Sequence, residues 1–196
     1  MWRYVVGIVI FLFLIFFGVK LFQAATKTST PKSSTSSKTT SLPDYASTTA
    51  QVRFTQDGPI NSNIAHRTIQ ITVGRDQSNL NIIQGYEGNS LRMHNYDNNQ
   101  SAYEVFLNAL NNAGFTNQKK NVKNTDETGQ CPLGFRYTYQ LMNTGSSDED
   151  KSLWSTSCGG LGTFGGNASM VMTLFQRQIP DYTVLTQDVT WTSSTQ

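Results

Sequence analysis

The feature that most constrains this chain of 196 residues is an unbroken apolar run near its N-terminus. The run extends from Tyr4 to Val19 and is flanked by Arg3 and Lys20. A helix rises about 1.5 Å per residue, so about 20 residues cross the roughly 30 Å hydrocarbon core of a bilayer. The flanking basic side chains can extend to the two interfaces. The sequence therefore predicts a transmembrane helix that contacts membrane lipid through residues 4–22.

A cleaved signal peptide is the alternative interpretation of this run. The apolar part of a signal peptide is shorter, about 7–15 residues, and a small-x-small cleavage site follows it. Here the run is longer, and the candidate sites at Gln23-Ala24-Ala25 place Phe22 or Gln23 where a small residue is needed. We therefore expect residues 1–25 to form a cytoplasmic tip and an uncleaved signal anchor.

Two opposing signals bear on the orientation of this anchor. Lys20, Lys27, Lys32 and Lys38 follow the run, and the positive-inside rule alone would place the C-terminus in the cytoplasm. However, almost nothing precedes the run that would need to be translocated, and the two cysteines downstream suit a disulfide, which persists in oxidising compartments. We therefore expect a single-pass membrane protein with a cytoplasmic N-terminus and an extracytoplasmic C-terminal domain.

The chain divides by composition into a linker and a domain. Residues 26–50 are rich in Ser and Thr and have no apolar periodicity, so they bury too little surface to offset chain entropy. We expect them to form a disordered linker. Residues 51–196 are sufficient for one domain with its own hydrophobic core. The chain has 15 Lys and Arg and 13 Asp and Glu, a balance that argues against a nucleic-acid partner.

Alternating apolar residues in the domain predict β-strands. The alternation is clearest in residues 67–73 and 135–141. Further strands are expected in residues 52–54, 80–83, 91–96, 153–157 and 184–191. Glycine and polar residues separate these segments, which is typical of an antiparallel sheet.

Two helices are expected between the strands. Ser101 and Glu104 match a capping box at the start of the first helix, and Gly114 marks its end. The second helix is expected to begin at Asn167. Asn99 and Asn167 both match a glycosylation sequon, but helix starts use such residues for capping in any case. Together the elements predict an α+β domain, an antiparallel sheet with two helices on one face.

Cys131 and Cys158 are the only cysteines of the chain. One opens the strand expected at residues 135–141 and the other closes the returning strand, so a hairpin would bring them together. A bridge closing a loop of this size stabilises a fold by roughly 3 kcal/mol in the chain-entropy model. Two cysteines alone make a poor zinc site, and there is no C-x-x-C motif. The sequence therefore predicts a structural disulfide.

Residues 160–165 match the G-x-G-x-x-G pattern of dinucleotide-binding folds. Such a site also needs a buried parallel strand before the glycines, whereas the preceding residues WSTSC are polar and end in a cysteine. We therefore expect no cofactor. Gly160, Gly162 and Gly165 are interpreted as a tight loop whose backbone N–H groups could face an anion.

No pattern in the sequence names a catalytic residue or a metal site. His66 and His94 are the only histidines, and neither has the spacing of a metal-binding motif. An envelope hydrolase would need one of them beside a carboxylate in a cleft. It is therefore the third functional hypothesis, behind two that need no catalysis.

Four stretches of the domain together resemble a known group of proteins: Ala102–Phe115, Cys131–Gly134, Leu153–Gly160 and Leu174–Tyr182. The group consists of uncharacterised single-pass, extracytoplasmic proteins of very small, host-attached bacteria. The resemblance spans most of the domain. It implies a location outside the cytoplasm, but the group has no established activity and supplies no catalytic residues.

The leading hypothesis is a surface-displayed binding or interaction module whose partner is a glycan or an envelope protein. Flat aromatic side chains suit both kinds of partner. The candidate ligand contacts combine such side chains with the glycine loop: Tyr137, Tyr139, Trp154, Gly160, Gly162 and Gly165. The alternative is a structural or assembly component of the cell envelope or of a secretion or pilus apparatus.

Overall fold

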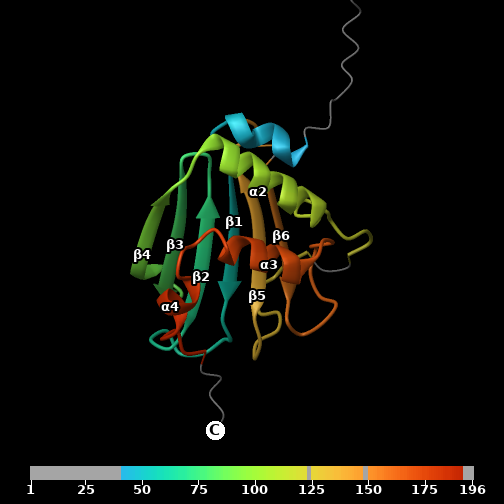
Figure 1. Ribbon diagram of the computed structural model, residues 1–196. Helices are drawn as coiled ribbons and strands as arrows, with labels where there is room; N and C mark the ends of the chain where they lie inside the picture. The colour runs from blue at the N-terminus through green and yellow to red at the C-terminus, as the bar shows by residue number, and fades with distance from the viewer. Residues whose placement is uncertain (1–40, 123–124, 148–149, 192–196) are drawn as a thin grey trace, which may run out of the picture. The chain divides into compact units, whose positions relative to one another are not determined.

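The computed structural model describes residues 41–122, 125–147 and 150–191 (Figure 1). Six strands form one antiparallel sheet in the order β4-β3-β2-β1-β5-β6. The strands are β1 (Gln51–Asp57), β2 (Arg67–Val73), β3 (Gln77–Gln84), β4 (Asn89–Asp97), β5 (Arg136–Met142) and β6 (Lys151–Thr156). The α+β class and the antiparallel sheet predicted from the sequence are confirmed.

The helices leave one face of the sheet open. They are the 3₁₀ helix η1 (Leu42–Ser47) and the α-helices α2 (Gln100–Asn112), α3 (Ala168–Gln176) and α4 (Tyr182–Thr186). Helices α2 and α3 cross the same face of the sheet, as predicted (Figure 1). Their rings meet over the core, where Phe106 of α2 makes an edge contact with Phe175 of α3 at 5.3 Å between centroids.

The two faces of the sheet follow from the alternation along each strand. Phe54 of β1 pairs with Ile71 of β2 and Tyr139 of β5, and all three side chains are buried under the helices. The next residue, Thr55, pairs with Gln70 and with a threonine of β5, and its side chain points to the opposite face. We call the helix-covered side the covered face and the other side the open face.

The folded domain begins earlier than composition indicated. Leu42 and Tyr45 of η1 are buried, and η1 packs against α2. Asp44 closes a capping box by accepting a hydrogen bond from the backbone N–H of Ser41 at 2.8 Å. The prediction that the disordered linker extends to residue 50 is therefore wrong, because three buried apolar residues are too few to show a period. Residues 26–40 lie outside the described residues.

The last predicted strand, residues 184–191, is also wrong. The chain forms the short helix α4 up to Thr186, and the described residues after it form no strand. Leu185 of α4 packs against the core, and so do Val189 and Trp191 beyond the end of the helix. The alternation of Val189 and Trp191 therefore reflects core packing without strand pairing.

Asparagine side chains cap the starts of α2 and α3. The side chain of Asn99 accepts from the N–H of Ala102, and that of Asn167 accepts from the N–H of Met170, each at 3.0 Å. The predicted capping box of Ser101 is therefore wrong by two residues, because the stronger cap lies just upstream. Within the described ranges, no helix is both long and apolar enough to cross a membrane. The predicted transmembrane segment, residues 4–22, lies outside them.

Candidate functional site

The disulfide predicted between Cys131 and Cys158 is present, with the two Cα atoms 5.7 Å apart. It joins the residue that leads into β5 to the residue that follows β6. The hairpin is closed further by Ser157, whose hydroxyl accepts from the N–H of Phe135 at 2.9 Å. This linkage fixes one border of the open face.

The candidate ligand contacts predicted on β5 belong to the covered face. Tyr139 is 1% exposed and stacks on Phe164 with 3.8 Å between centroids. Its hydroxyl lies 3.0 Å from that of Ser155, and burial raises the pKa of Tyr139 to about 12. Tyr139 is therefore a core residue, and its prediction as a surface contact is wrong. Tyr137, two residues earlier, is half-buried on the same face.

Both tyrosines line an apolar cavity of about 190 Å³ beneath α3, together with Ala168, Ser169 and Met172. Burial also raises the pKa of Tyr137. The cavity belongs to the interface between the sheet and the helix. The two tyrosines therefore do not share a contact surface with the residues discussed next.

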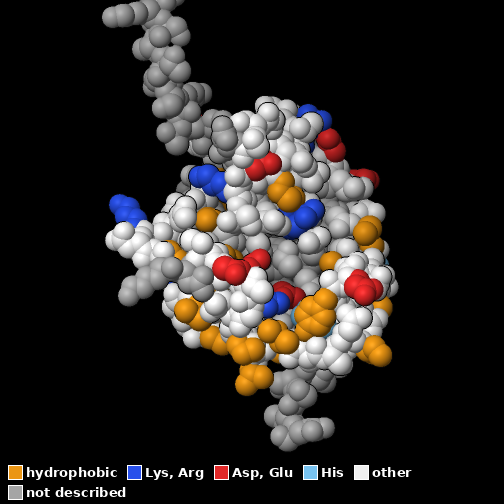
Figure 2. All heavy atoms as spheres, turned by 180° about the vertical axis from the view of Figure 1, so that it is seen from behind, with side chains coloured by type: hydrophobic (Ala, Val, Ile, Leu, Met, Phe, Trp, Pro, Cys, Tyr) orange, Lys and Arg blue, Asp and Glu red, His pale blue; other side chains and the backbone are white. Residues whose placement is uncertain are grey.

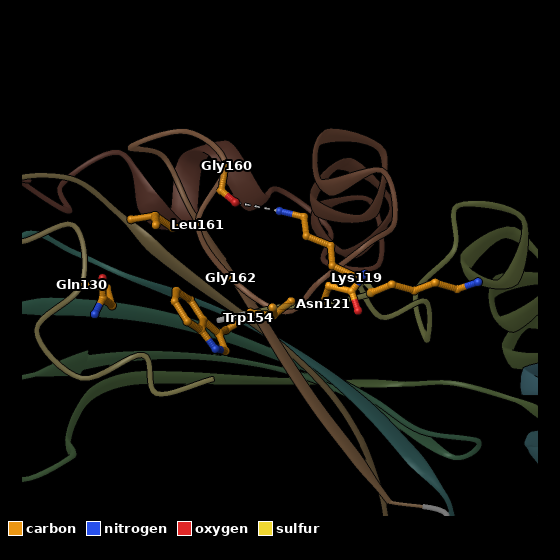
Figure 3. Close-up of a pocket in the computed structure, with 9 residues that line it drawn as sticks. Lys119, Asn121, Gln130, Trp154, Gly160, Leu161 and Gly162 are labelled. Carbon is orange, nitrogen blue, oxygen red and sulfur yellow. Dashed lines mark hydrogen bonds between the residues drawn. The ribbon is translucent and has the colours of Figure 1, made fainter. Parts of the chain in front are cut away.

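Trp154 lies on the open face because it pairs with Thr138 rather than with a core position. It is 5% exposed, and its indole N–H donates to the carbonyl of Thr125 at 2.9 Å. Trp154 forms the base of a cavity of about 300 Å³ (Figure 3). We call this the tryptophan cavity. Its lining is Lys119, Lys120, Asn121, Val122, Gln130, Trp154, Gly160, Leu161 and Gly162.

Three of the predicted contacts, Trp154, Gly160 and Gly162, meet in the tryptophan cavity. Figure 3 shows the ammonium of Lys119 pointing toward the carbonyl of Gly160, which accepts its hydrogen bond at 3.1 Å. Gly162 has φ 111°, and a Cβ there would overlap the backbone of Trp154. A glycine is therefore required at this position.

Gly165 lies outside the tryptophan cavity. Its N–H donates to the carbonyl of Asn117 at 2.8 Å, which joins the glycine loop to the segment after α2. The strand before the glycines, β6, is an edge strand that pairs antiparallel with β5. A dinucleotide site needs a parallel strand before its glycines, whereas the strand before this loop is antiparallel.

A second cavity of about 370 Å³ lies on the open face, at the ends of β1 and β5. We call it the threonine cavity. Its lining is entirely polar or charged: Thr55, Asp57, Thr68, Glu127, Thr128, Arg136 and Thr138. Figure 2 shows this side of the molecule, with acidic and basic side chains next to each other in a hollow.

Asp57 is the structural centre of the threonine cavity. One carboxylate oxygen accepts from Thr68 at 2.7 Å and faces Nε2 of His66 at 2.8 Å. The other oxygen accepts from the guanidinium of Arg136. Burial lowers the pKa of Arg136, whereas the ion pair with Asp57 favours the charged guanidinium. Asp57 therefore positions its neighbours rather than presenting open lone pairs.

His66 is held in place from three sides. It is 2% exposed, its ring stacks on Tyr86 with 4.1 Å between centroids, and Nδ1 lies 3.2 Å from the carbonyl of Pro59. Both ring nitrogens therefore face protein oxygens, which leaves neither for proton transfer with a bound substrate. His94 lies on β4, opposite Leu80. His66 lies beside a carboxylate, as the hydrolase hypothesis requires, but it does not line the threonine cavity, and this geometry does not favour that hypothesis.

The border of the open face below the hollow carries exposed apolar side chains (Figure 2). Ile64 and Leu133 are 78% and 77% exposed, and Ile60 and Tyr86 are partly exposed beside them. The loops that carry these residues are joined, because the N–H of Ile60 donates to the carbonyl of Pro132 at 2.8 Å. We call these four exposed residues the apolar rim.

The sequence interpretation missed the threonine cavity. Its residues occupy the polar positions of β1, β2 and β5, which were assigned to the solvent side of each strand and not considered further. The register supplies the missing signal, since Asp57 pairs with both Thr68 and Arg136. Within the described part of the chain, no group of three or more His, Cys, Asp or Glu side chains could hold a metal ion.

Comparison with known proteins adds no family: no family model matches the chain, and no curated protein sequence is similar to it.

Proposed function

We propose that this protein is a membrane-anchored binding module, displayed outside the cytoplasm, that binds its ligand in the two cavities of the open face. The observation that carries the proposal is the asymmetry of the sheet. Helices close one face, whereas the other is left without helices and is hollowed by cavities of about 300 and 370 Å³. Cavities of this size with converging polar groups are typical of ligand sites.

The surroundings of the site support display in an oxidising compartment. The Cys131–Cys158 disulfide borders the open face, and such bridges persist outside the reducing cytoplasm. The apolar run of residues 4–22 supplies the anchor in this proposal, and residues 26–40 supply a spacer. The domain would then sit at a distance from the bilayer, with its open face accessible to soluble or surface-bound partners.

The test uses the full-length chain in lipid nanodiscs, applied to a glycan array and to solubilised envelope fractions. We expect this screen to identify a ligand. Its binding should be lost or weakened in the variant Gln130→Ala, because Gln130 lines the tryptophan cavity. Asn111→Ala is the matched control, because Asn111 is an exposed amide on α2, which covers the other face. Equal binding by both variants, or no partner from either source, would contradict the proposal.

The apolar rim favours one second candidate, an assembly component of the envelope. Exposed Ile64 and Leu133 on adjoining loops suit a protein contact better than a polar ligand. In that case crosslinking in whole cells would join the chain to another envelope protein, and the double variant Ile64→Ser, Leu133→Ser would abolish the crosslink. The binding-module proposal predicts no change in ligand affinity for the same double variant.

A further inference from the structure

The threonine cavity has a chemistry distinct from that of the tryptophan cavity beside it. Hydroxyl, carboxylate and guanidinium groups line it, with no apolar side chain among them. Its volume of about 370 Å³ falls in the range of small-ligand sites and exceeds what one or two water molecules need. A ligand that fits here can form hydrogen bonds at several points, while threonine methyl groups supply apolar contacts between them.

The hydrogen bonds already present decide which groups remain for a ligand. Asp57 receives bonds from Thr68 and Arg136 and faces His66, so its carboxylate is committed to the protein. Glu127 accepts a long bond of 3.4 Å from Thr138, which leaves lone pairs on its carboxylate for stronger donors. A guanidinium has five N–H donors, so Arg136 retains donors beyond the one given to Asp57.

These groups favour a ligand whose polar atoms both donate and accept. A carboxylate only accepts, a guanidinium only donates, and a threonine hydroxyl does both. Ligand hydroxyl groups can bond to all three. A carboxylate ligand could bond to Arg136 but would be repelled by Glu127.

The charge of the cavity also disfavours anions. The carboxylates of Asp57 and Glu127 face a single guanidinium, that of Arg136, which is already paired with Asp57. A phosphate or sugar acid would therefore meet an uncompensated carboxylate. Asp57 already compensates the charge of Arg136, so the charge left over is the carboxylate of Glu127. A ligand without acidic groups avoids repulsion by this carboxylate.

We infer that the threonine cavity binds a polyhydroxyl ligand without acidic groups, a saccharide unit of a glycan. This inference rests on the proposed binding function and adds the class of ligand and the residues that select it. Thr138 and Glu127 are the groups that contact the ligand hydroxyls. Asp57 is a positioning residue, because it holds Arg136 and His66 through hydrogen bonds and an ion pair.

The experiment measures binding of four probes to the full-length chain in nanodiscs by saturation-transfer NMR and calorimetry. The neutral probes are glucose and N-acetylglucosamine, the anionic probe is glucuronic acid, and the cationic probe is glucosamine, so that all four are single sugar units. We expect at least one neutral probe to bind and glucuronic acid to bind at least tenfold more weakly. Glucosamine, whose ammonium can pair with Glu127, should bind no more weakly than glucose. Loss of one hydrogen bond to a charged group corresponds to about tenfold in affinity, so Glu127→Gln should weaken the neutral probe by about that factor. Thr138→Val removes a hydrogen bond between neutral groups and should weaken it by about fivefold.

Thr72→Val is the matched control. Thr72 lies on the open face of β2 but outside the cavity, where its hydroxyl accepts from Arg53 at 3.0 Å. It should leave the affinity within about twofold, as expected for a residue that does not touch the ligand. Intact disulfide and an unchanged thermal melt show that each variant is folded. If Thr138→Val does not fold, Glu127→Gln carries the test, because it keeps the size of the side chain.

Several outcomes would overturn the inference while leaving the proposed function in place. These are equal weakening by Thr138→Val and Thr72→Val, tighter binding of glucuronic acid than of either neutral probe, and capture of an envelope ligand by a chain that binds no saccharide. If neither envelope fractions nor saccharides yield a ligand, the proposed function and the inference fail together.

Discussion

The covered face and the open face of the sheet are built from the same strands but by opposite rules. On β1, Phe54 points to the covered face and is enclosed by the rings of Tyr139 and Phe175, each with 5.7 Å between centroids. Its neighbour Thr55 points to the open face, where its hydroxyl accepts a long hydrogen bond from Gln70 at 3.5 Å. One residue step therefore separates dense packing from a surface of exchangeable hydrogen bonds.

The difference shows which face contributes most to stability. Apolar burial stabilises the fold in proportion to the area removed from water, so substitutions on the covered face act through the whole domain. Polar groups on the open face exchange one hydrogen bond for another with water, and the net contribution of each is small. The threonines of the open face can therefore vary with little effect on the fold, whereas the Asp57–Arg136 pair cannot, because loss of one partner leaves an unpaired charge.

The largest effect should come from comparing neighbours on β1. Phe54→Ala removes a buried ring and leaves a cavity, so we expect the free energy of unfolding to fall by about 3–5 kcal/mol. Thr55→Ala, one residue away on the open face, should lower it by no more than about 1 kcal/mol. Urea denaturation followed by circular dichroism measures both. Similar losses for the two variants would break the distinction between the faces.

The disulfide should come next in size. Reduction of Cys131–Cys158, or the double variant Cys131→Ser, Cys158→Ser, removes a closed loop of 27 residues in sequence separation. The chain-entropy model gives a loss of roughly 3 kcal/mol for such a loop. The same urea titration with and without dithiothreitol measures it. The serine variant should show no response to the reductant, and a wild-type midpoint that ignores the reductant would contradict the prediction.

High pH should destabilise the covered face through Tyr139. Burial raises the pKa of its hydroxyl to about 12, and the ordinary value of 10.0 applies in the unfolded chain. The contribution is therefore complete below pH 10 and is lost as the pH rises through 12. The slope is about 1.4 kcal/mol per pH unit, so the total is of the order of 2–3 kcal/mol. Urea titrations at several pH values, with tyrosinate absorbance as the second signal, measure it.

Tyr139→Phe is the control for this prediction. It removes the ionisable group and the hydroxyl contact with Ser155, so its stability starts lower but falls less steeply above pH 10. Tyr103 is also buried and its pKa is also raised, so part of the slope should remain. Parallel curves for the wild type and Tyr139→Phe would show that the loss arises elsewhere.

The sequence predicted the covered face far better than the open one. Apolar alternation identified Ile69, Ile71 and Val73 as a strand, and strand order placed the two cysteines together, because both signals are local or nearly so. The threonine cavity depends on the pairing of Asp57 with residues of β2 and β5, and pairing partners are long-range. A lone polar residue at an outward position shows nothing of the neighbours that give it a function.

The grouping of the aromatic candidate contacts was wrong for a related reason. Tyr137, Tyr139 and Trp154 were grouped because all are aromatic and close in sequence. Side chains alternate between the two faces along each strand, so the pairing of β5 with β6 decides which face each ring occupies. Trp154 pairs with Thr138, so it faces away from both tyrosines. Composition showed that aromatic residues were present, and only the register shows which face each one occupies.

The smallest expected change in stability comes from the N-terminal cap of α2, which lies on the covered face. Asn99 caps α2 through its side chain, so Asn99→Ala should lower the free energy of unfolding by about 1 kcal/mol. Ser101→Ala should change it by about 0.5 kcal/mol or less, because the side chain of Ser101 does not cap the helix. Because α2 lies on the covered face, neither variant should change the ligand affinity of the folded protein. Stability comes from urea titration and affinity from calorimetry on the same samples. A larger loss of stability for Ser101→Ala than for Asn99→Ala would indicate that Ser101 caps the helix. Weakened ligand binding by Asn99→Ala would show that the two faces are coupled through the sheet.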